Sequence, residues 1–351
     1  MSAPSHPSRR RRGRFLRRGS AFAVLLALGG YLTMQYLTGG TGAPRCEVVS
    51  GKGDGASYEF TPEQATNAAT ISAVGTSRGM PERAVTIALA TALQESGLRN
   101  ITHGDRDSLG LFQQRPSQGW GTEKQIMDPT YAAGEFYEHL TKVPGYSRLP
   151  LTVAAQRVQR SGFPQAYAKH EPDATLLAAA LTGRAAATLT CEGRPAATAN
   201  GGPDAVRAAL VRDFGRTVLE SAATEMRSDD SAATPEPTNA PESPNAPETA
   251  AASPTTPAAN TVSIPVRSDS GSGTTSEDSL RRRGWELAHW AVANSSALHI
   301  ERVAYADREW VAGGRAGEWR TPADSGASAG AYGDEGAGRD GLSEVRIVTG
   351  Q

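Results

Sequence analysis

The stretch that decides the fold runs from Ala84 to Trp120 and reads AVTIALATALQESGLRNITHGDRDSLGLFQQRPSQGW. Its residues up to Leu93 are almost wholly apolar and include no Gly or Pro, which predicts a helix buried on most sides. Glu95 falls on the last turn, and Gly97 provides a stop because glycine readily adopts the left-handed conformation that closes a helix. A carboxyl group at the rim of an apolar surface loses hydration, so we expect a raised pKa for Glu95. Such a group can donate a proton near neutral pH.

The residues that follow predict a return of the chain towards this carboxyl group. His103 to Ser108 is polar and typical of a turn, and Gly110 to Gln114 (GLFQQ) is an apolar pair followed by two amides. A loop or short hairpin here brings Gln113 and Gln114 back towards Glu95. The alternative interpretation is a glutamate that merely ends a helix at the surface.

This motif resembles that of a known superfamily. A helix ending in Glu95-Ser96, then Ser108 to Gln113 (SLGLFQ) with Pro116 beyond, resembles the soluble lytic transglycosylases and goose-type lysozymes. The version HGDRDSLGLFQQRPSQGWGT is similar to lysozyme-like domains of actinobacterial envelope proteins and phage tail proteins. The likeness covers about residues 61–191. It implies a lysozyme-like fold, peptidoglycan glycan strands as the substrate, and Glu95 as general acid and base.

The same resemblance implies a set of residues that line the substrate site. Amides can hydrogen-bond acetamido groups, and aromatic faces can stack on sugar rings. We expect these contacts from Ser96, Gln113, Gln114, Trp120, Gln156 and Tyr167. The family usually carries a Tyr-Asn pair in its penultimate helix, whereas residues 154–161 here read AAQRVQRS, so Gln156 and Gln159 are the alternatives for that place.

The reaction type stays open between a lyase and a hydrolase. A lytic transglycosylase needs one carboxyl group, whereas a hydrolase usually needs a second one. Asp105 and Asp107 are the only near carboxylates in sequence, and both also fit turn-forming residues. We predict no metal site and no cofactor, because the six histidines are scattered and no phosphate-binding loop occurs.

Two other classes of function compete with the enzyme. One is a non-catalytic module that binds peptidoglycan, which the missing Tyr-Asn pair supports. The other is an envelope scaffolding protein whose C-terminal domain does the work. The complete motif around Glu95 favours a glycan-cleaving enzyme, and the sequence identifies no protein partner.

The N-terminal end predicts attachment to a membrane. The overall net charge of −1 argues against a nucleic-acid partner, but the charge is unevenly placed. Seven arginines lie within the first eighteen of the 351 residues, so the remainder carries about −8 (−1 minus +7). Ala21 to Leu37 is mostly apolar, and we expect residues 19–38 to form a single-pass signal anchor without a convincing cleavage site. Residues 1–18 then lie in the cytoplasm and the bulk of the chain outside the cell membrane. A secreted protein and twin-arginine export are the alternatives.

The chain has two cysteines, Cys46 and Cys191, which flank the lysozyme-like region. In an exported chain, a disulfide between them clips the ends of that domain together and contributes about 4 kcal/mol in the entropic model. A lipid on Cys46 and two unpaired thiols are the alternatives.

Composition and helix signals predict a mainly α (α+β) chain in several parts. A Gly-rich tether (39–60) precedes the lysozyme-like helical domain (61–192), whose first helix starts with Thr61 as N-cap, Pro62 and the capping-box residue Gln64. Further helices are expected at 129–141, 151–159, 164–169 and 174–181, and an amphipathic helix at 203–226. Residues 227–279 are rich in Pro, Ala, Ser and Thr and predict a disordered linker.

Residues 280–351 regain large apolar side chains and predict a small α/β domain. We expect a helix at 282–293 and strands at 298–305, 309–312 and 345–348. The segment resembles the small α/β domain of secreted actinobacterial wall-associated proteins, a likeness that names no chemistry. His289 and the tryptophans are expected to lie in its core.

Overall fold

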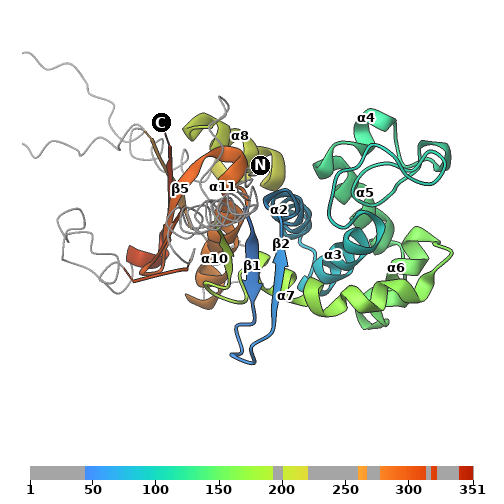
Figure 1. Ribbon diagram of the computed structural model, residues 1–351, viewed down its shortest axis with the longest axis horizontal. Helices are drawn as coiled ribbons and strands as arrows, with labels where there is room; N and C mark the ends of the chain where they lie inside the picture. Colours follow the sequence, from blue (N-terminus) through green and yellow to red (C-terminus); the bar gives the residue numbers. More distant parts are fainter. Residues whose placement is uncertain are drawn as a thin grey trace, which may run out of the picture. The chain divides into compact units, whose positions relative to one another are not determined.

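The computed structural model describes residues 44–192, 201–219, 260–266, 277–313, 318–321 and 340–350 (Figure 1). The predicted cytoplasmic segment, the predicted membrane anchor and most of the predicted linker lie outside these residues. Among the described helices, none combines the length and apolar composition that crossing a bilayer requires.

Helices dominate the chain up to Leu181. They are α2 (Pro62–Ser77), α3 (Glu82–Ser96), η1 (Pro116–Gln118), α4 (Glu123–Ile126), α5 (Pro129–Thr141), η2 (Tyr146–Arg148), α6 (Leu151–Gln159), η3 (Pro164–His170) and α7 (Glu171–Leu181). Their ends follow the local signals. Thr61 and Gln64 form the predicted capping box, and Gly97 closes α3 with φ at 62°. The segment predicted as a helix at 164–169 is a 3-10 helix, η3.

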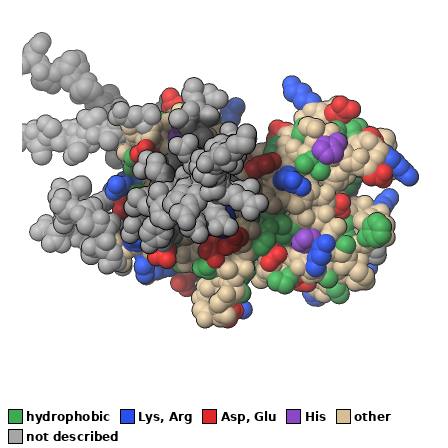
Figure 2. Space-filling view, viewed as in Figure 1, with side chains coloured by type: hydrophobic (Ala, Val, Ile, Leu, Met, Phe, Trp, Pro, Cys, Tyr) green, Lys and Arg blue, Asp and Glu red, His purple; other side chains and the backbone are tan. Residues whose placement is uncertain are grey.

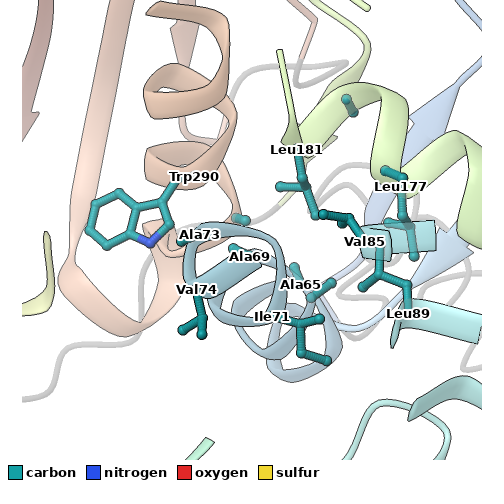
Figure 3. Packing of buried hydrophobic residues seen from close by; sticks show 14 of the residues in the cluster. Ala65, Ala69, Ile71, Ala73, Val74, Val85, Leu89, Leu177, Leu181 and Trp290 are labelled. Atoms are coloured by element: carbon teal, nitrogen blue, oxygen red, sulfur yellow. The ribbon is translucent and has the colours of Figure 1, made fainter. Parts of the chain in front are cut away.

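Helix α2 lies at the centre of the buried core. Its small residues Ala65, Ala69 and Ala73 allow neighbouring helices to approach closely, and α2 packs on α3, α5, α7 and α10 (Glu277–Ala293). Figure 3 shows Trp290 of α10 against one side of α2, and the leucines of α3 and α7 gathered by its other side. Because both sides are covered, α2 has only a weak amphipathic pattern in its sequence.

A three-stranded antiparallel sheet closes the ends of this region. Its order is β2 (Ser57–Phe60), β1 (Cys46–Val49) and β3 (Leu189–Cys191). Cys46 and Cys191 are directly opposed in the β1–β3 pair and form the predicted disulfide. The prediction of a tether at 39–60 was therefore wrong for the two strands. Val48 and Phe60 are buried, so these short strands gain apolar contacts that the Gly-rich sequence around them did not indicate.

The amphipathic helix after this sheet is shorter than the predicted 203–226. Helix α8 (Pro203–Phe214) ends where Gly215 takes a φ of 85°. Val206, Leu210 and Phe214 are buried on one face, as their spacing predicts. Residues 217–219 are again helical, and residues 220–226 lie outside the described part of the chain.

The C-terminal region forms a four-stranded antiparallel sheet beside α10. The strands follow the order β4 (Thr261–Pro265), β7 (Glu344–Thr349), β5 (Ile300–Tyr305) and β6 (Arg308–Val311), with α11 (Ser295–Leu298) and η6 (Asp340–Leu342) as connections. Strand β4 corrects the predicted linker at 227–279, because Val262 and Ile264 are buried in its pairing with β7. Helix α10 also starts five residues before the predicted Arg282.

Helix α10 docks on the helices of the preceding region through buried polar contacts. Trp290 Nε1 donates to Asp213 Oδ2 on α8 at 2.8 Å, and Thr70 Oγ1 on α2 donates to the same oxygen at 3.2 Å. His289 Nδ1 lies 2.8 Å from the carbonyl oxygen of Ala180, and its Nε2 accepts the backbone N–H of Thr188 at 3.2 Å. The described residues from Arg45 onward therefore share one core and form one compact unit, in which His289 and the tryptophans are buried as predicted.

These contacts make the docking of α10 sensitive to pH. The two neighbours of the His289 ring require the neutral tautomer with the proton on Nδ1, because a backbone N–H can only donate. Burial lowers the pKa of His289 to about 4 from 6.5. Stability from this neutral ring is complete above pH 6.5 and is lost as the pH falls towards 4, by up to about 3 kcal/mol. Urea unfolding from pH 7 to 4.5 measures it, and His289→Gln should flatten the pH dependence; equal slopes in both proteins would contradict this prediction.

The disulfide should carry a comparable share of the stability. Cys46 and Cys191 are 145 positions apart, so the bond closes a long loop in the unfolded chain. Reduction should lower the free energy of unfolding by about 4 kcal/mol in the entropic model. Urea titrations of the oxidised and reduced protein test this, with the Cys46→Ser/Cys191→Ser variant as a control that reductant must leave unchanged.

Candidate active site

Glu95 lies on the last turn of α3, at the end of an apolar core helix. Residues Ala84 to Leu93 of that helix are buried, whereas Glu95 itself is only partly buried. Desolvation raises the pKa of the Glu95 carboxyl above its ordinary value, and hydrogen bonds from Tyr167 and Gln159 oppose that rise. The raised pKa agrees with the expectation from the sequence, and the carboxyl group keeps some access to solvent.

Tyr167 is the most direct partner of this carboxyl group. Its hydroxyl donates to Glu95 Oε1 at 2.6 Å, from its position in η3, which packs on α3. Burial, followed by the bond to Glu95, raises the pKa of Tyr167, so the hydroxyl stays protonated and can only donate to a carboxylate. The sequence placed Tyr167 among the substrate contacts, whereas the structure places it as the residue that orients the acid.

The turn after α3 returns to the end of that helix. Leu109 and Gln114 form an antiparallel bridge with backbone hydrogen bonds of 2.9 and 3.0 Å. Ser96 Oγ donates to the carbonyl oxygen of Leu111 at 2.8 Å and so ties this turn to the end of α3. Phe112 is buried and stacks on Phe136 of α5 at 4.7 Å between ring centroids.

A second connection joins the turn to α6. Gln159 Nε2 donates to the carbonyl oxygen of Phe112 at 2.7 Å, and the same side chain influences Glu95. Gln156, the residue that we selected from the sequence, donates instead to the carbonyl oxygen of Ser161 at 2.8 Å. Of the two alternatives for the missing Tyr-Asn pair, Gln159 is therefore the one beside the acid. Nothing in the local sequence distinguishes Gln156 from Gln159, so only the fold shows which of them lies beside Glu95.

Two predicted substrate contacts are corrected by their burial. Ser96 and Gln114 are 6% and 1% exposed. The Ser96 hydroxyl is used within the protein, and Gln114 Nε2 donates to the carbonyl oxygen of Ala132 at 3.0 Å. Both side chains are therefore engaged within the protein and support the site from its interior side.

Gln113 and Trp120 remain partly accessible. Gln113 has a φ of 49°, and its Nε2 lies 3.3 Å from the carbonyl oxygen of Gly110. Trp120 stacks on His139 of α5 at 4.1 Å between ring centroids. The structure supplies no direct contact from either residue to Glu95, so their role as substrate contacts stays a prediction.

Asp105 and Asp107, which the sequence offered as a second catalytic carboxylate, lie in the loop after α3 and pair with arginines. Asp107 pairs with Arg115 Nε at 2.7 Å and accepts the Ser117 N–H at 2.8 Å. Hydrogen bonds from Ser117 and Arg115 hold the pKa of Asp107 well below its ordinary range. Asp105 is exposed and has a loose pairing with Arg106 at 3.9 Å. Asp107 thus stabilises the loop, as the turn interpretation predicts.

Within the described ranges, no cluster of three or more His, Cys, Asp or Glu side chains could hold a metal ion.

A scan against protein-family models finds no model that matches the chain, and a search of curated proteins finds no match either.

Replacing Tyr167 by Phe should raise the pKa of Glu95 further, because the hydroxyl favours the ionised carboxylate and burial opposes it. Carbon-detected NMR titration of the Glu95 carboxyl measures this directly. Tyr58→Phe on strand β2 is the matched control and should leave the Glu95 titration unchanged. An unchanged or lowered pKa in Tyr167→Phe would mean that the hydrogen bond does not stabilise the carboxylate.

Proposed function

We propose that this chain is an extracytoplasmic enzyme that cleaves the glycan strands of peptidoglycan, with Glu95 as general acid and base. The observation that carries the proposal is one partly buried carboxyl group at the end of an apolar helix, oriented by Tyr167 Oη at 2.6 Å. Burial raises the pKa of this carboxyl group, which is the direction that a general acid requires. The substrate class comes from the resemblance of the motif around Glu95.

A lytic transglycosylase reaction fits this site better than hydrolysis. Protonated Glu95 donates its proton to the glycosidic oxygen as the bond from that oxygen to C1 of the muramoyl residue breaks. The Glu95 carboxylate then takes the proton of the muramoyl 6-hydroxyl as its oxygen bonds to C1, which regenerates the acid. The cycle needs one carboxyl group and no added water, and Asp107 is held by Arg115.

The disulfide supports the proposed location outside the cytoplasm. Cys46 and Cys191 are paired in the structure, and such bonds persist in oxidising compartments. Attachment to the cell membrane rests on the sequence of residues 19–38, and secretion is the alternative.

The full-length chain is the appropriate protein for the test, since α10 shares the core of the lysozyme-like region. Wild type should release soluble muropeptides from purified peptidoglycan. Glu95→Gln should reduce release by roughly 10²- to 10⁴-fold, because the amide keeps the shape and cannot donate the proton. Glu123→Gln, at an exposed position on α4, is the control and should retain full activity.

Mass spectrometry of the products decides the reaction type. Anhydro ends indicate the lyase, and reducing ends indicate the hydrolase. If wild type and Glu95→Gln bind peptidoglycan equally and neither releases product, the chain is a binding module and the proposed enzymatic function is wrong.

A further inference from the structure

The segment from Lys142 to His170 carries positive charge without any acid. It contains Lys142, Arg148, Arg157, Arg160 and Lys169, and no Asp or Glu. Lys142 pairs with Glu138 at 2.8 Å. The other four cations are exposed and form no ion pair with any carboxylate in the described part of the chain. We call Lys142 to His170 the basic segment.

This basic segment is also the part of the chain that completes the candidate site. Its residues Gln159 and Tyr167 both act on the Glu95 carboxyl group. Arg160 follows Gln159 directly and ends α6 with a φ of 51°, its N–H bonded to the carbonyl oxygen of Gln156 at 2.8 Å. A left-handed conformation is costly for a residue with a side chain, and such positions often occur at functional sites.

The basic segment also borders the aromatic pair formed by Trp120 and His139. Burial lowers the pKa of His139, the positive charges of Lys142 and Arg160 lower it further, and the carboxylates of Glu135 and Glu138 oppose that shift. Arg160 therefore lies close enough to interact electrostatically with His139, whose ring stacks on Trp120 at 4.1 Å. Arg160 thus follows the Glu95 partner Gln159 in the chain, and its charge reaches His139 of the Trp120–His139 stack.

An exposed aromatic residue lies on the same segment. Phe163 is 79% exposed, and its backbone N–H is fixed by Ser161 Oγ at 3.2 Å. Figure 2 shows basic, acidic and hydrophobic side chains interspersed over the region that Figure 1 labels α4, α5 and α6. The basic segment therefore offers both charge and an apolar contact to a ligand.

We propose that the basic segment binds the carboxylates of the stem peptides on the glycan strand, with Arg157 and Arg160 as the principal contacts. This inference rests on the proposed function and names the part of its substrate that the site recognises. The helix dipole explains one cation at the end of α6. It does not account for the other exposed cations of the segment, which also form no ion pair within the described part of the chain.

The test uses soluble, uncross-linked glycan strands that carry their stem peptides, and the same strands after amidation of their carboxylates. The full-length protein, Arg157→Gln/Arg160→Gln and the charge-conserving Arg157→Lys/Arg160→Lys are compared for binding and for initial rates. Arg207→Gln, at an exposed position on α8, is the matched control. Thermal unfolding of each variant confirms that it is folded.

The Gln variant should bind native strands roughly tenfold more weakly and raise KM to the same extent, with kcat within about twofold of wild type. The Lys variant should recover most of the binding, and added salt should weaken wild type most. On amidated strands, wild type and the Gln variant should become equal. Equal binding of native and amidated strands by wild type, or an unchanged Gln variant, would overturn the inference.

Binding and activity separate this inference from the proposed function. If wild type releases no product from either kind of strand, the enzymatic proposal fails, and the difference in binding between native and amidated strands still decides the role of the basic segment. If product is released equally from both and the Gln variant is unaffected, the enzyme stands and the basic segment is not its carboxylate site.

Discussion

Helix α2 is buried on nearly all of its sides, and this constraint determines the arrangement of the described chain. Its small side chains leave it without a strong apolar stripe, so its stability depends on neighbours that cover each face. Helices α3 and α7 cover one side, and α10 covers another from the distant C-terminal region. Thr66 Oγ1 donates to the carbonyl oxygen of Ala293 at 3.3 Å, and Asp213 joins Thr70 and Trp290. Removing α10 would expose a core helix, so the C-terminal region is part of this fold.

The packing of α3 against α2 and α7 sets the environment of the Glu95 carboxyl group. A carboxyl group at the end of such a helix loses water on its apolar side and keeps a fixed position. Ser96 then anchors the turn that contains Leu111, and Gln159 anchors the same turn from α6. The turn at Leu111, helix α6 and η3 therefore meet at the end of α3, and hydrogen bonds of 2.6 to 2.8 Å hold them there.

The sequence predicted what is encoded locally. The capping box at Thr61 and the stop at Gly97 each depend on residues within one helical turn, and the structure has the helix ends there. The disulfide was also predictable, since the chain has two cysteines. Strand β4 was missed because Thr261 to Pro265 gains its apolar burial from β7, which is far away in sequence.

The site residues, like the helix ends, were predictable only where the local sequence marks them. Glu95 stands out through its helix and motif, but the choice between Gln156 and Gln159 depends on which side of α6 faces Phe112. Likewise, nothing local distinguishes Gln114, which turns inward to Ala132, from an amide that faces a ligand. These outcomes are set by tertiary packing, which a single sequence does not display.

The environment of Glu95 combines two opposing influences, and that combination suits a carboxyl group with two tasks. Burial raises its pKa and favours the acid, whereas donors from Tyr167 and Gln159 favour the carboxylate. In the proposed lyase cycle, the same group must first give a proton and then take one, so neither form can be strongly disfavoured. Burial alone would raise the pKa of the carboxyl group so far that it would be a weak proton donor. Hydrogen-bond donors alone would lower the pKa and keep the group ionised. The pairing of an apolar helix end with a protonated tyrosine hydroxyl therefore accounts for how one residue could serve both steps.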